Sequence, residues 1–373
     1  MAIIAIFCDG TWNSFDNPDQ THVARFSQAC AETDGQMPMY FQGVGTDEGM
    51  ISDMGRWLSK VGGGVFGWGL TRNLKAAYHE VCKCYEPGDK IMVFGFSRGA
   101  YTARSLVGMI RKCGILSDPT AQNLRRAVRL YRKRGSENAP DKPHIWAERR
   151  ALSPQFATSP KDVIRRADGS ALVRVSYVGV WDTVGALGVP RSVLGPIASL
   201  WNRRYSFHDT SLSGLVEQAR HAVALDERRV LFEPCLWDNL ETSQAGPGLN
   251  FGDQSETRRY QQKWFVGNHG IVGGSVAPMG LAMASLVWIW QGAEDAGLRL
   301  KPDTRLFETS VDMATDAPEL YRVTWLFKLA RWLVRWRKGP TRSQDLHDTA
   351  RLRATVLPSY RPRSLYRILP GLF

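Results

Sequence analysis

A serine stands between two glycines in the pentapeptide Gly95-Phe96-Ser97-Arg98-Gly99. The apolar run over residues 91–94, which follows turn-forming residues, is typical of a buried strand, and residues 100–110 are compatible with a helix. A strand, a glycine-flanked serine and a helix form the nucleophile elbow, whose sharp turn exposes the hydroxyl at the edge of a sheet. The pattern therefore predicts Ser97 as a nucleophile.

A serine hydroxyl needs a base to take its proton, and that base is normally a histidine oriented by a buried carboxylate. In α/β-hydrolases the order along the chain is serine, acid, histidine, and each residue follows a strand. Of the seven histidines, only His269 lies after Ser97, follows a strand-like run directly and has glycines around it. Asp182 ends the most strongly β-prone run of the second half and lies between the two. We therefore predict Ser97, Asp182 and His269 as a catalytic triad.

Asp226 is the alternative acid, because it also lies between the serine and the histidine. Two arginines, Arg228 and Arg229, stand close to it in the sequence. Their proximity favours a structural ion pair over a catalytic role for Asp226.

Acyl transfer creates an oxyanion, which backbone N–H groups stabilise. One donor should be the N–H of Arg98, the residue after the nucleophile, at the N-terminus of the following helix. The second should come from the loop after the first strand, where Gly10 and Thr11 are the natural donors. Asp9 in the same loop either takes part in this hole or holds the loop by its own hydrogen bonds.

Strands and helices alternate around these candidate residues. The strand-like runs cover residues 2–7, 39–45, 91–94, 172–181 and 263–267. The segments with helical spacing cover residues 74–84, 100–110, 212–225 and 281–290. This alternation predicts an α/β fold of the α/β-hydrolase type, with a mainly parallel central sheet flanked by helices.

Composition changes along the chain suggest its domain organisation. We expect a hydrolase domain over residues 1–300 and a basic, partly helical C-terminal extension over residues 301–373. Residues 117–170 are polar and contain prolines and clusters of basic residues. We expect them to form an insertion over the sheet in the position of a cap, or else a solvated basic surface.

The six cysteines have neither disulfide nor zinc-site spacing, which predicts free thiols in a reducing compartment and no metal or other cofactor. The apolar N-terminus is short, lacks a basic leader and runs into Asp9, so it predicts a first strand and not a signal peptide. We therefore expect a protein that is cytoplasmic as synthesised and is exported, if at all, by a non-classical route.

The net charge of +12 suits an anionic partner such as a phospholipid surface. No nucleic-acid-binding motif accompanies this charge, so nucleic acid is not the expected partner. Tryptophans and basic residues alternate with helical spacing towards the C-terminus, and from Trp325 to Lys338 they predict an interfacial helix that contacts a membrane peripherally. The alternative is a helix docked on the body of the protein with its basic face in water.

Five strings resemble a single family: FCDGTWN at residues 7–13, GFSRGAY at 95–101, VWDTVG at 180–185, ALDERR at 224–229 and WFVGNH at 264–269. This is the uncharacterised α/β-hydrolase domain family that includes the first class of type VI secretion lipase effectors. The resemblance spans about residues 3–297. It implies a serine hydrolase fold, with Ser97, Asp182 and His269 as the triad, phospholipase activity in the effector members, and type VI secretion as the non-classical route.

Together these patterns predict a serine esterase or lipase, and most specifically a phospholipase, that forms an acyl-enzyme at an anionic lipid interface. In one place the sequence departs from the family, which usually has Ser-Asp after the histidine where this chain has Gly270-Ile271. The departure motivates an alternative, a catalytically weak or inactive hydrolase-fold module that binds membranes or a protein partner.

Overall fold

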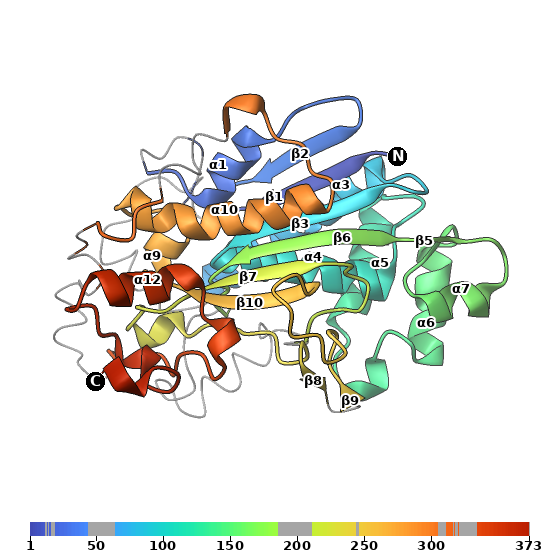
Figure 1. Ribbon diagram of the computed structural model, residues 1–373. Helices are drawn as coiled ribbons and strands as arrows, with labels where there is room; N and C mark the ends of the chain where they lie inside the picture. The colour runs from blue at the N-terminus through green and yellow to red at the C-terminus, as the bar shows by residue number, and fades with distance from the viewer. Residues whose placement is uncertain are drawn as a thin grey trace.

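A six-stranded parallel sheet forms the centre of the protein, as a computed structural model shows (Figure 1). The structure describes residues 1–11, 13, 15, 19–43, 64–185, 211–243, 246–304, 311–315, 317, 320 and 334–372. The strand order is β10-β7-β6-β3-β1-β2, and all neighbours are parallel. The strands are β1 (Ile3–Cys8), β2 (Gln36–Phe41), β3 (Lys90–Phe96), β6 (Arg174–Trp181), β7 (Ala219–Ala224) and β10 (Tyr260–Phe265). The predicted α/β fold is thereby confirmed.

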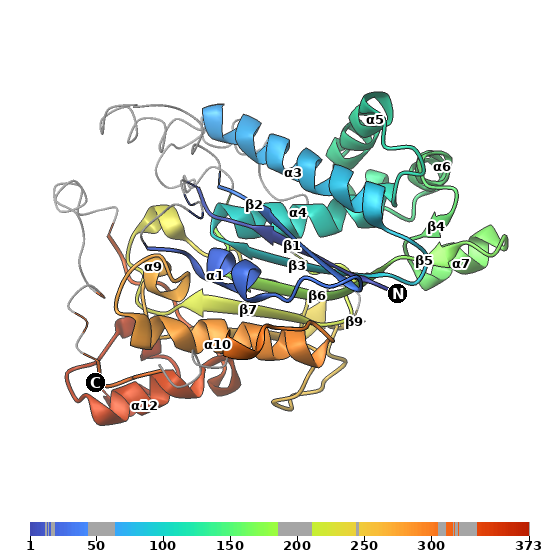
Figure 2. The ribbon, with the colours of Figure 1, turned by 90° about the horizontal axis from the view of Figure 1, so that it is seen from above.

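Helices cover both faces of this sheet, which explains why β1 and β3 are almost entirely apolar. Figure 2 shows α3 (Gly64–Cys84) and α4 (Arg98–Cys113) on one face, and α1 (His22–Ala29) and α10 (Met279–Asp295) on the other. Alternate residues of each strand face opposite sides. Two separate apolar clusters result, one on each face of the sheet.

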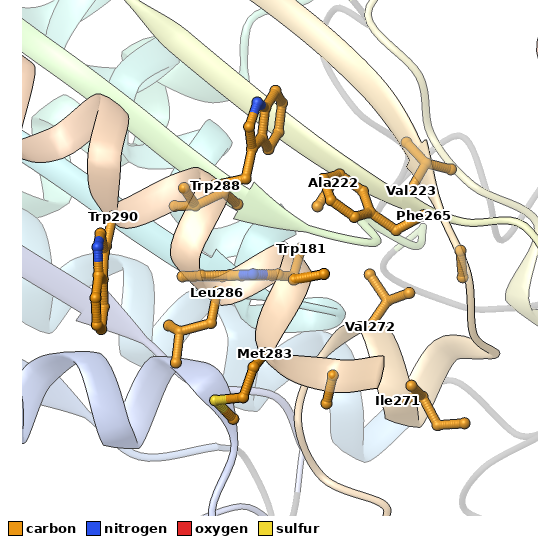
Figure 3. Close-up of a cluster of buried hydrophobic side chains, with 14 of the residues drawn as sticks. Trp181, Ala222, Val223, Phe265, Ile271, Val272, Met283, Leu286, Trp288 and Trp290 are labelled. Carbon is orange, nitrogen blue, oxygen red and sulfur yellow. The ribbon is translucent and has the colours of Figure 1, made fainter. Parts of the chain in front are cut away.

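The cluster under α10 is rich in aromatic residues (Figure 3). Trp181, at the end of β6, is fully buried and lies against Met283 and Leu286 of α10. Its indole N–H donates to the Ser285 carbonyl oxygen at 3.3 Å. This packing fixes the end of β6, and therefore the position of the next residue along the chain.

The strand β7 occupies a place where the sequence predicted a helix over residues 212–225. Apolar residues recur there at helical spacing, at positions 212, 215, 216, 219, 222 and 223. The segment nevertheless pairs with β6 on one side and β10 on the other. Tertiary pairing between two buried strands therefore overrides the local pattern. No helix among the described residues is long and apolar enough to span a membrane.

The insertion over residues 117–170 does not form a cap at the carboxyl edge of the sheet. It contains α5 (Ala121–Arg132), α6 (Pro143–Leu152), α7 (Pro160–Arg166) and β4 (Phe156–Ala157), and β5 (Ala171–Leu172) follows it directly and pairs with β4. These elements lie at the end of the molecule opposite α9 (His269–Val272) (Figure 1). They pack around the end of α4, where Cys113 Sγ donates to the Ala127 carbonyl oxygen at 3.2 Å. The helix α4 runs away from the carboxyl edge, so its far end carries the insertion about 24 Å from that edge.

The described C-terminal residues are part of the same body and not a separate extension. Leu346 forms a parallel bridge with Trp264 of β10, and α12 (Asp348–Val356) follows it. Ala350 and Tyr360 belong to the apolar cluster that contains Trp264. The packing therefore gives no support for a domain boundary at residue 300.

The predicted tryptophan-rich helix lies largely outside the described residues, because positions 321–333 are not among them. Its described end is not helical. Val334 forms an antiparallel bridge with Arg229, and the Arg335 N–H donates to the Arg228 carbonyl oxygen at 2.7 Å. The prediction that the helix reaches Lys338 is wrong, because this stretch pairs with the loop after β7 in extended form.

Candidate active site

Ser97 occupies a strained turn between β3 and α4. Its backbone has φ 56° and ψ −122°, a conformation that costs energy for any residue with a side chain. A Cβ atom on Gly95 would lie 2.6 Å from the Gly99 carbonyl oxygen, and one on Gly99 would lie 2.1 Å from the Cys8 carbonyl oxygen. Both glycines are therefore required for α4 to approach β3 and β1 this closely.

A chain of hydrogen bonds joins the three residues predicted as the triad. Ser97 Oγ lies 2.8 Å from His269 Nε2, and His269 Nδ1 lies 2.5 Å from Asp182 Oδ2. All three side chains are buried. They follow β3, β6 and β10, whose carboxyl ends share one edge of the sheet. The structure thus brings together residues that are far apart in the sequence.

Asp182 is held ionised by its surroundings. Burial alone would raise the pKa of this carboxyl, but the Arg337 guanidinium and the hydrogen bond from His269 outweigh burial and hold the pKa well below its usual range. The Ala224 N–H also donates to Asp182 Oδ1 at 2.9 Å. An ionised carboxylate can only accept hydrogen bonds, so His269 carries its proton on Nδ1. Nε2 is then free to accept the hydrogen bond of the Ser97 hydroxyl.

Backbone and ring contacts hold His269 in this orientation. Its N–H donates to Glu227 Oε2 at 3.1 Å, and the preceding Asn268 caps α9 by accepting from the Ile271 N–H at 3.1 Å. The Phe96 and Phe232 rings each lie 4.7 Å from the imidazole, centroid to centroid. Burial lowers the pKa of the His269 imidazole below its ordinary value of 6.5, although the Asp182 carboxylate opposes this shift. The imidazole is therefore neutral at pH 7 and can accept a proton.

The alternative acid, Asp226, does not contact the imidazole. Its Oδ2 accepts hydrogen bonds from the Gly267 N–H at 2.7 Å and from the Tyr360 hydroxyl at 2.9 Å. It thereby ties the loop that carries His269 to the C-terminal residues. The ion pair predicted at this string belongs instead to Glu227, whose Oε2 lies 2.7 Å from Arg229 Nη2.

Asp9 holds the loop after β1 through three hydrogen bonds. Its Oδ1 accepts from the Gly10 N–H at 2.6 Å, and its Oδ2 accepts from the Thr21 hydroxyl at 2.7 Å and the Tyr40 hydroxyl at 2.6 Å. Burial raises the pKa of Asp9 to about 6, against the opposing effect of these hydrogen bonds. Of the two roles that the sequence left open, these contacts are those of a residue that supports the loop.

The same contacts bear on the predicted oxyanion donors. The Gly10 N–H donates to Asp9 Oδ1, so of the two predicted donors in this loop Thr11 is the one whose N–H is not engaged by Asp9. The loop does lie against Ser97, because a Cβ on Gly10 would be 3.4 Å from the Ser97 Cβ. Arg98 begins α4 directly after Ser97, as the prediction requires.

Arg337 is the residue that sequence reasoning missed. Its Nη1 donates to Asp182 Oδ1 at 2.6 Å and its Nη2 donates to Asp182 Oδ2 at 2.9 Å. In the sequence it stands among Arg335 and Lys338, within the stretch interpreted as an interfacial helix. No local signal distinguishes it from these neighbours.

A buried serine that donates to a neutral histidine can lose its proton as it attacks an electrophilic carbon. The parallel sheet, the strained turn and this hydrogen-bonded chain together define the class of α/β-hydrolase-like proteins. Within that class, the chain belongs to the family described as the Tle1-like phospholipase effector catalytic domain of the type VI secretion system. The family's sequence profile matches residues 3–292.

The proteins similar to this chain include the following three. YEL023C, an uncharacterised protein of Saccharomyces cerevisiae, is 32% identical over 169 residues, which are 45% of this chain and 22% of that protein. An uncharacterised Pseudomonas aeruginosa protein, known as a crystal structure, is 15% identical with a TM-score of 0.45, covering 86% of this chain and 52% of its own. The Tle1 effector bound to the VgrG spike of the type VI secretion system is 14% identical with a TM-score of 0.38, covering 75% of this chain and 52% of its own. The chain thus spans at most 52% of each protein's length.

Proposed function

We propose that this chain is a serine hydrolase of carboxylic esters, and specifically a lipase or phospholipase. The observation that carries the proposal is the continuous hydrogen-bonded chain from Ser97 through His269 to Asp182 at the carboxyl edge of the sheet. Membership in a family of phospholipase effectors supports the substrate class, and it supports export by the type VI route.

In the proposed reaction Ser97 Oγ attacks the ester carbonyl carbon while His269 Nε2 takes the hydroxyl proton. The carbonyl oxygen becomes an oxyanion that accepts hydrogen bonds from the N–H groups of Arg98 and Thr11. When the intermediate collapses, His269 gives its proton to the departing alcohol and the acyl group stays on Ser97. Water, deprotonated by His269, then attacks the acyl-enzyme and releases the acid. Asp182 holds the imidazole and stabilises its charged form throughout.

An anionic lipid interface is the proposed location of the substrate. The chain carries a net charge of +12, and residues 349–372 contain five arginines and no acidic residue. In this stretch α12 exposes Leu352 and Val356, at 53% and 48% of their surface. The helix lies at the same end of the molecule as α9, which begins with His269 (Figures 1 and 2). Apolar side chains among arginines suit the surface of an anionic membrane.

A fluorophosphonate probe tests nucleophile and activity together. We expect it to label the wild-type protein at a single peptide that contains Ser97, and to leave His269→Gln unlabelled because the serine loses its base. Fatty acid release should be faster from vesicles that contain phosphatidylglycerol than from phosphatidylcholine alone. If the probe does not label the folded wild-type protein, the hydrolase proposal is wrong. If fatty acid is released at equal rates from both kinds of vesicle, the proposed preference for an anionic lipid surface is wrong.

The pH dependence follows from the lowered pKa of His269. A protonated imidazole cannot accept the Ser97 proton. The value of kcat/KM is therefore at its maximum above the His269 pKa and decreases as the pH falls through that pKa. Because burial places this pKa below 6.5, we expect a plateau through neutral pH and a half-maximal rate below pH 6.5. The measurement is kcat/KM on a neutral soluble ester, with circular dichroism at each pH to separate titration from unfolding. A midpoint above pH 6.5 would contradict the prediction.

A further inference from the structure

The guanidinium of Arg337 reaches Asp182 from a part of the chain beyond the residues that the family profile matches. Two parallel N–H···O bonds join the groups, from Nη1 to Oδ1 at 2.6 Å and from Nη2 to Oδ2 at 2.9 Å. Both side chains are buried, with 3% and 0% exposed. This fork-to-fork arrangement gives a strong and directional ion pair.

Two backbone carbonyls fix the guanidinium in turn. Nη1 also donates to the Ala224 carbonyl oxygen at 2.8 Å, and Nη2 donates to the Phe232 carbonyl oxygen. Ala224 ends β7, and Phe232 places its ring against His269. Arg337 therefore connects the carboxylate, the end of a central strand and the loop that packs on the imidazole.

The charges around the imidazole balance only because Arg337 is present. The charged groups that act on the imidazole are Asp182 after β6 and Glu227 and Arg229 after β7, and Arg337 from the C-terminal residues acts on Asp182. Glu227 is paired with Arg229, and Asp182 is paired with Arg337. With a neutral imidazole this set has no net charge. Without Arg337 it would carry one negative charge in a buried site, which favours uptake of a proton.

We propose that Arg337 is a positioning residue for the hydrolase reaction proposed above, and that it keeps the Asp182–His269 pair free of an extra proton at neutral pH. Its two hydrogen bonds fix the plane of the carboxylate that accepts the hydrogen bond from His269 Nδ1–H. Its charge opposes protonation of either partner. The C-terminal residues are then a necessary part of the active site, although the proposed nucleophile, base and acid all precede them.

The first test is a direct titration of His269, which requires no turnover. Histidine-labelled protein is followed by NMR, and the His269 signal is assigned by its loss in His269→Gln. We expect Arg337→Met to raise the midpoint at which the Asp182–His269 pair takes up a proton, whichever partner holds it. Lys338→Met is the matched control, because it removes a positive charge from an exposed neighbour. An unshifted midpoint in Arg337→Met, or an equal shift in Lys338→Met, would overturn the proposal.

The second test is kinetic. In Arg337→Met we expect the acid limb of kcat/KM to move to higher pH and the plateau to fall by about 10²-fold, because the carboxylate loses its fixed plane. Arg337→Lys keeps the positive charge but cannot form the two parallel hydrogen bonds. Its plateau should therefore also fall, while its acid limb should shift less than that of Arg337→Met. If Arg337→Met does not fold, the Arg337→Lys variant provides the test. A plateau rate and a His269 titration equal to those of the wild type in that variant would refute the role of the two parallel hydrogen bonds. A shifted titration in a protein that hydrolyses no ester would reject the proposed function and leave standing the inference that Arg337 keeps the Asp182–His269 pair free of an extra proton.

Discussion

Replacing Ser97 with alanine should abolish ester hydrolysis while leaving the fold intact. The variant loses the hydroxyl that attacks the substrate carbonyl in the proposed reaction, and losses of nucleophile in serine hydrolases reach roughly 10⁶-fold in kcat. Alanine has the same Cβ as serine, so the strained backbone at φ 56° is no worse than before. Fatty acid release from phosphatidylglycerol vesicles is the measurement, and circular dichroism confirms the fold.

Vesicle binding by the same variant separates catalysis from membrane contact. We expect Ser97→Ala to sediment with anionic vesicles as the wild type does, because Ser97 is buried and takes no part in the surface of α12. Turnover within tenfold of the wild type would mean that another group is the nucleophile. Wild-type protein that binds vesicles without hydrolysing any lipid would instead favour the alternative of a non-catalytic module.

The arrangement of Ser97, Asp182 and His269 was predictable because a parallel sheet places the residues that follow its strands at one edge. Each residue directly follows a strand-like run, and the carboxyl ends of parallel strands share one edge. Long, mostly apolar runs such as β3 and β6 are visible in a single sequence, since burial on both faces leaves few polar positions. Once the strands are identified, the residues after them must meet at one edge whatever their separation along the chain.

Other features depended on contacts that no local pattern records. The strand β7 has helical spacing and becomes a strand only between β6 and β10. The insertion over residues 117–170 has the composition of a cap, but composition does not say which end of α4 it covers. The direction of the Gly10 N–H depends on how Asp9 turns its carboxylate. Arg337 meets Asp182 across 155 positions, and it looks like any other basic residue of its segment.

Asp182→Asn is the second change with a large expected effect, because it damages both the chemistry and the fold. An amide can offer its N–H to the histidine, which favours the tautomer that cannot accept the serine proton, and such a change in a serine protease lowers kcat about 10⁴-fold. It also leaves the Arg337 guanidinium buried without its counter-charge. Removing one partner of a buried ion pair typically costs about 3–5 kcal/mol of stability. Urea unfolding and kcat/KM of the variant measure the two effects separately.

The double variant Asp182→Asn with Arg337→Met distinguishes the two effects. Methionine fills part of the space of the arginine stem and carries no charge, so the unpaired buried cation disappears. We therefore expect the double variant to have a higher free energy of unfolding than Asp182→Asn alone. The coupling energy between the two substitutions, measured in a double-mutant cycle, should exceed the experimental error. Its kcat/KM should stay as low as that of Asp182→Asn, because the histidine still lacks its carboxylate. Recovery of activity along with stability would mean that Asp182 serves the fold and not the reaction.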